Sequence, residues 1–194
     1  MKFSIFSFQF SILVTCALLL VTPVLASEND IGYSKLDPSS PVYFLKVIRE
    51  NIEMKAAVTQ RVKWLRSLEF TTRRLREARS LIKKDTNLIS PTLEKYSSHL
   101  RSLPDKNIND EEVGMRIKES LGIHLETLEQ MYSQLSDKRA KMTVMATLNK
   151  IVNRADVSSD VKLSVCNLFA KEATSSALNQ TEQYVLSERA RTCQ

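Results

Sequence analysis

Apolar residues recur at steps of three and four over most of this chain, and this spacing is the strongest constraint on its fold. The clearest run consists of Ile117, Leu121, Leu125, Leu128, Tyr132 and Leu135. Such spacing places side chains on one stripe of an α-helix, whereas a half-buried strand would alternate every second residue. The 194 residues include only three glycines and five prolines, so helix breakers are scarce. The sequence predicts an all-α fold, a bundle of antiparallel helical hairpins with about six to seven helices after a signal peptide.

The N-terminus has the pattern of an export signal. Lys2 precedes an apolar stretch over residues 8–21, and Val24 and Ala26 are small or short residues at signal-peptidase spacing. We therefore predict a signal peptide over residues 1–26. The alternative is an uncleaved anchor, because the stretch is near the lower length limit for crossing a bilayer. Either way we expect an exported protein that is periplasmic, cell-surface or secreted, with membrane contact only through this segment if it stays uncleaved.

The rest of the chain divides at polar stretches. We expect a flexible lead over residues 27–38, an N-terminal three-helix unit over 39–104, a linker over 105–110 and a C-terminal helical half over 111–194.

Four helix starts can be predicted from capping signals. Ser40-Pro41 and Ser90-Pro91 each pair a cap residue with a proline, while Asn109 with Glu112 and Asn179 with Glu182 have capping-box spacing. The first of these helices should end near Ala57 and pack through Leu45, Ile48 and Ile52. A turn is expected at Ser136-Asp137, the alternative being one continuous helix to Arg154.

The second helix, over residues 59–84, is strongly basic. With Asp85, which follows it, the segment has nine cations and three acids and a net charge of +6, which equals the formal net charge of the whole chain. Either its cations are solvated around the bundle, or they bind anionic envelope polymers or lipid headgroups. Nucleic-acid binding is disfavoured, because the chain is expected outside the membrane and has no base-reading aromatic cluster. The possible anion-binding surface consists of Arg61, Arg66, Arg73, Arg74, Arg76, Lys83 and Lys84.

Two cysteines follow the signal segment, and export would permit a disulfide between Cys166 and Cys193. The alternative is a buried free thiol at Cys166 and an unpaired thiol at Cys193, near the terminus. Neither cysteine has metal-type spacing, so no zinc site is expected.

The sequence contains no catalytic motif. His99 and His124 lie on separate predicted helices without metal-ligand spacing, which favours solvated or helix-capping roles. We expect no catalytic, cofactor-binding or metal-binding residues, no cofactor and no enzymatic activity. Met131, Met142 and Met145 indicate a soft apolar seam; core packing is the simpler interpretation, and a groove that captures apolar segments is the alternative.

Two segments resemble a bacterial extracytoplasmic, all-helical domain of unknown function. Its members open with a Pro-x-Ser-Pro-x-Tyr-x-Leu-Lys type of motif and continue into an Arg-Arg-Leu-x-Glu-Ala helix. The matching residues are Pro38, Ser40, Pro41, Tyr43, Leu45 and Lys46, then Arg73, Arg74, Leu75, Glu77 and Ala78. A later His-Leu-Glu-x-Leu-Glu segment is similar to His124, Leu125, Glu126, Leu128 and Glu129. The resemblance implies a helical domain outside the cytoplasm and assigns no activity.

These observations favour a non-enzymatic envelope protein that binds or scaffolds a partner, either an unknown protein or an anionic envelope polymer. The alternative is an extracytoplasmic chaperone or stress-sensing module that uses an apolar groove.

Overall fold

The computed structural model describes residues 31–105, 108–154, 157–175 and 178–192, and every structural statement below refers to these residues. Regular secondary structure in these ranges is entirely helical, which confirms the predicted all-α class. The elements are α2 (Tyr43–Lys55), α3 (Gln60–Leu81), the 3-10 helix η1 (Thr86–Leu88), α4 (Ile89–Arg101), α5 (Glu111–Gln134), α6 (Lys138–Val152), α7 (Ser159–Ala173) and α8 (Gln180–Thr192). The predicted signal peptide lies outside the described residues.

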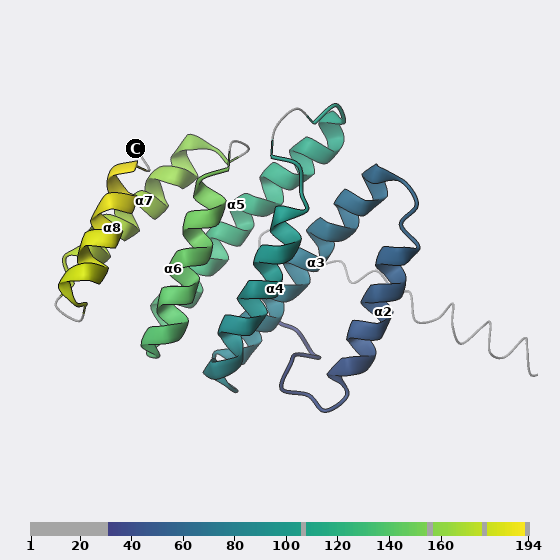
Figure 1. Cartoon of the computed structure of the whole chain (residues 1–194), viewed down its shortest axis with the longest axis horizontal. Helices are drawn as coiled ribbons and strands as arrows, with labels where there is room; N and C mark the ends of the chain where they lie inside the picture. The colour runs from purple at the N-terminus through teal and green to yellow at the C-terminus, as the bar shows by residue number, and fades with distance from the viewer. Residues whose placement is uncertain (1–30, 106–107, 155–156, 176–177, 193–194) are drawn as a thin grey trace, which may run out of the picture.

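The helices follow one another roughly in chain order across the molecule, from α2 at one end to α8 at the other (Figure 1). Consecutive helices pack as hairpins, with α3 on α4, α5 on α6 and α7 on α8. Further contacts of α4 with α6 and of α3 with α5 join the hairpins into one bundle. α2 is consequently the outermost element at its end of the row and packs on α3.

The core is one cluster of buried apolar side chains that reaches from Leu68 of α3 to Leu186 of α8. The predicted seam of α5 lies inside it, and Ile117, Leu121, Leu125 and Leu128 are fully buried. The cluster includes residues on both sides of the expected linker at 105–110, so the two sequence halves share this core.

Two predicted helix starts, those of α6 and α8, are confirmed by side-chain caps. Asp137 accepts a hydrogen bond from the Ala140 N–H at 2.7 Å and begins α6, so the continuous helix considered as an alternative is wrong. At the start of α8, the Glu182 N–H donates to the Asn179 side chain at 2.8 Å, and the Asn179 N–H donates to the Glu182 carboxylate at 2.9 Å. This reciprocal pair is the predicted capping box.

Three predicted starts are wrong by one or two residues. α2 begins at Tyr43, and its N-cap position is Val42 rather than Ser40. α4 begins at Ile89, before the expected cap Ser90. α5 is capped by Asp110, which accepts from the Val113 N–H at 3.1 Å, instead of by Asn109. A proline is tolerated anywhere in the first turn, where the N–H groups have no partner within the helix, so Ser-Pro marks a helix start only approximately.

One described cysteine takes part in a disulfide. Cys166 of α7 is 2% exposed and disulfide-bonded, whereas Cys193 lies outside the described residues. We expect that Cys193→Ser lowers the free energy of unfolding by about 3 kcal/mol, because it removes a closed loop that restricts the unfolded chain. Denaturant unfolding measures the loss, and reduction of the wild-type chain should reproduce it. A non-reduced peptide map in which Cys166 of the variant is still linked would contradict the predicted pairing.

Candidate functional site

A buried cluster of charged and hydroxyl groups joins α2 to α3. The Tyr43 hydroxyl donates to Glu77 Oε2 at 2.9 Å, and Lys46 Nζ lies 2.6 Å from Glu77 Oε1. Arg74 donates to the same carboxylate at 2.6 Å, and its other terminal nitrogen contacts Glu50. Glu77 is 0% exposed and Arg74 2% exposed, so these charges are held away from water. We call these five residues the ionic cluster.

Arg73 extends the ionic cluster toward solvent. Its guanidinium lies 2.9 Å from Glu53 and 3.5 Å from Glu50, and it also contacts Glu69. Burial raises the pKa of Glu50 above its usual range, although the nearby charge of Lys46 acts in the opposite direction. The two segments that carry the family resemblance therefore meet in space, because Tyr43 and Lys46 of the first contact Arg74 and Glu77 of the second.

The opposite face of α2 is apolar and faces solvent. The sequence predicted that Leu45, Ile48 and Ile52 pack against the bundle, but they are 55%, 51% and 63% exposed, so this prediction is wrong. The reason is that the polar face of α2, with Tyr43 and Glu50, satisfies its groups on α3, and both faces of one helix cannot point inward.

The seven residues of the predicted anion-binding surface do not share one open face. Arg73 and Arg74 belong to the buried ion pairs described above. The others mostly contact groups of this chain: Arg61 lies 2.8 Å from Asp110, Arg66 lies 2.6 Å from Glu69, Lys84 lies 2.6 Å from Asp37, Arg76 donates to the Ile31 carbonyl, and Lys83 is exposed. Much of the charge of α3 thus binds neighbouring segments.

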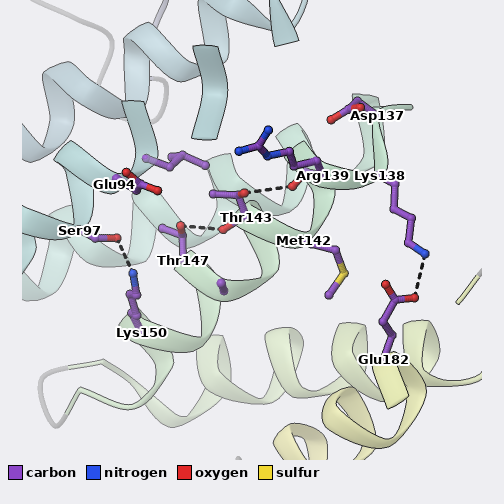
Figure 2. Close-up of a pocket in the computed structure, with 12 residues that line it drawn as sticks. Glu94, Ser97, Asp137, Lys138, Arg139, Met142, Thr143, Thr147, Lys150 and Glu182 are labelled. Carbon is purple, nitrogen blue, oxygen red and sulfur yellow. Dashed lines mark hydrogen bonds and ion pairs between the residues drawn. The ribbon is translucent and has the colours of Figure 1, made fainter. Parts of the chain in front are cut away.

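A groove of about 750 Å³ runs between α4 and α6 and reaches the start of α8. Figure 2 shows its charged rim, in which Lys150 of α6 donates to Ser97 of α4 at 3.1 Å and Lys138 of α6 pairs with Glu182 of α8 at 2.9 Å. The groove is also lined by the apolar residues Leu93, Met142 and Ala146 and by Thr143 and Thr147. Its floor is therefore partly apolar and its rim is charged, which suits a peptide segment with apolar side chains.

The three methionines separate into two roles. Met131 and Met145 are 0% and 1% exposed and belong to the core, as the simpler interpretation predicted. Met142 is half-buried and lines the groove, so it alone fits the alternative interpretation of a groove-lining methionine.

The predicted roles of the two histidines are wrong. His124 is 1% exposed, with Nε2 2.9 Å from the Thr72 hydroxyl and Nδ1 3.2 Å from the Tyr96 hydroxyl. Burial lowers the pKa of His124 to about 3, and the charge of Arg76 contributes in the same direction. His99 is half-buried against Phe70, and burial lowers its pKa as well.

The described residues contain neither a metal-binding cluster nor a membrane-spanning helix. Across residues 31–105, 108–154, 157–175 and 178–192, no three or more His, Cys, Asp or Glu side chains are placed to hold a metal ion. In those same ranges no helix has both the length and the apolarity needed to cross a membrane.

The fold and the ionic cluster define an all-helical domain. The chain belongs to the family described as Domain of unknown function (DUF5667), whose profile matches residues 35–163. The matched region includes the ionic cluster and most of the groove lining. No curated protein and no solved structure matches the chain.

Proposed function

We propose that the protein is an exported, non-enzymatic binding module that holds a segment of a partner protein in the groove between α4 and α6. The observation that supports this most is the apolar part of the groove floor, Leu93, Met142 and Ala146, in a groove whose rim is charged. A partner segment that covers this floor would bury apolar surface, and the charged rim would fix its orientation.

The rim also favours a particular kind of segment. Arg139 and Lys150 are exposed at the groove, while Lys138 is paired with Glu182 and Asp137 is engaged as the cap of α6. Glu94 is the remaining acid of the lining. A segment with apolar side chains followed by an acid would complement this arrangement, because the acid could pair with Arg139.

The test is a selection of displayed random peptides on the full chain, repeated on Ala146→Trp. An indole at position 146 would fill the groove, and Ala146 itself lies outside the core cluster. We expect the wild-type chain to enrich peptides that combine apolar and acidic residues, and we expect Ala146→Trp to weaken them at least about tenfold.

Leu163→Trp is the matched control, because Leu163 is 53% exposed on α7 and lies outside the groove lining. It should leave peptide affinity unchanged. Peptides without a consensus, or peptides that bind Ala146→Trp as tightly as the wild type, would contradict the proposal.

The chaperone interpretation is a second candidate, favoured by Met142 in the groove lining. A chaperone would suppress aggregation of an unfolded client without selecting a peptide consensus, so the same selection separates the two functions.

A further inference from the structure

α2 presents a broad apolar face to solvent at the end of the molecule. Its inward face is occupied by the ionic cluster, and the apolar side chains of its other face are exposed. The exposed side chains on this face are Val42, Phe44, Leu45, Ile48 and Ile52, each at least 47% exposed. We call them the α2 face.

The apolar surface continues onto the start of α3. A groove of about 400 Å³ lies between the two helices and is lined by Leu45, Ile48, Ile52, Ala56 and Val62. Val58, in the turn between the helices, is 86% exposed. Contiguous exposed apolar surface of this kind marks an interaction site rather than ordinary surface variation.

The charge around the α2 face has one sign. Over residues 41–63, the side chains that are both charged and exposed are Arg49, Lys55, Arg61 and Lys63. Of the two acids of α2, Glu50 is buried, and Glu53 is shared between Arg73 at 2.9 Å and Arg49 at 3.1 Å. Arg61 is neutralised by Asp110 and Glu112, which leaves a cationic border of Lys55 and Lys63 together with Arg49, whose partner Glu53 is shared.

We propose that the α2 face adsorbs to the surface of a bilayer that contains anionic phospholipids. Apolar side chains on one face and cations at its border are the features of helices that lie in the membrane interface. Lys and Arg near such a surface are attracted to anionic headgroups. With 13 residues, α2 is too short to span the hydrocarbon core, which needs about 20, so it would lie in the plane of the interface.

Charge decides against a second copy of this chain as the occupant. If two α2 faces met, the cationic borders would face each other without exposed acids from residues 41–63 to pair with them. An anionic lipid surface instead complements the border over its whole length. The proposal also differs from the sequence prediction, which placed membrane contact only in the signal segment.

The test measures partitioning of the full chain onto vesicles by co-sedimentation. One set contains equal parts phosphatidylglycerol and phosphatidylcholine, and the other contains phosphatidylcholine alone. We expect stronger binding to the anionic vesicles. Ile48→Asp and Ile52→Asp should each weaken that binding at least about tenfold, because each replaces an aliphatic side chain that would insert into the bilayer interface with a charge that the anionic headgroups repel. Residues 1–30 are common to all variants, so the difference isolates α2.

Leu163→Asp is the matched control, since Leu163 has a similar exposure on α7 and the same substitution there should not change partitioning. Circular dichroism checks that each variant is folded, which is expected because Ile48 and Ile52 lie outside the core cluster. Arg49→Gln together with Lys55→Gln should reduce the preference for the anionic vesicles.

Two results would overturn the proposal. One is equal binding of the wild type and Ile48→Asp to anionic vesicles. The other is absence of vesicle binding together with a dimer, seen by light scattering, that Ile48→Asp dissociates; that result would assign the α2 face to a second copy. Neither outcome bears on peptide selection by the groove, because Ile48 and Ile52 are not among the residues that line it.

Discussion

Glu77→Ala is expected to lower the free energy of unfolding by about 3–5 kcal/mol, because it leaves a buried cation without its partner. Glu77 accepts hydrogen bonds from Tyr43 and Arg74 and pairs with Lys46, and it is 0% exposed. Without the carboxylate, Arg74 retains only Glu50 as an acidic partner. Urea unfolding followed by circular dichroism measures the change.

Two further variants separate the causes of this loss. Glu77→Gln keeps the shape of the side chain and removes the charge, so it should retain most of the loss if charge is responsible. Glu69→Ala removes a carboxylate that is 41% exposed on the same helix, and it should cost less than about 1 kcal/mol. A loss below about 1 kcal/mol for Glu77→Ala would show that Glu77 and Arg74 are not a desolvated pair.

Lowering the pH is expected to destabilise the folded protein, because buried His124 resists protonation. The pKa of His124 is about 3 in the folded chain, compared with about 6.5 for an unperturbed histidine. The folded state thus binds fewer protons than the unfolded state between these values, and the stability present above pH 6.5 is lost as the pH falls toward 3. Over about two pH units this one group accounts for roughly 2–3 kcal/mol.

The measurement compares unfolding free energies of the wild type and His124→Gln at about pH 7 and about pH 4.5. Glutamine does not titrate, so the variant should lose less stability on acidification than the wild type. Other groups, including Glu50 and His99, titrate in both proteins and cancel in the comparison. Parallel pH profiles would contradict a neutral, buried His124.

The fold class and the α5 seam could be predicted because apolar spacing reports helical structure directly. Which face of α2 packs against the bundle could not be predicted. The spacing of Leu45, Ile48 and Ile52 defines an apolar stripe, but it does not say whether that stripe faces the bundle or solvent. A signal was nevertheless present on the opposite face. Lys46 and Glu50 are four residues apart, and Arg74 and Glu77 are three apart, which places each pair on one helix face.

The groove could not be predicted from the sequence, for a different reason. Its lining combines Leu93 of α4, Met142 of α6 and Glu182 of α8, which are brought together only by tertiary packing. The methionine pattern drew attention to Met142, but it equally selected Met131 and Met145, which belong to the core.

The ionic cluster also has a consequence for the order in which the chain folds. A contact between charges becomes strong only when water has been removed from around it, since the surrounding dielectric falls at that point. The site that receives Tyr43 and Glu50 is enclosed partly by Lys95 and His99 of α4, so it is dry only after α3 and α4 have packed. Although α2 precedes α3 in the chain, we therefore expect its docking to be a late step that follows assembly of α3 and α4.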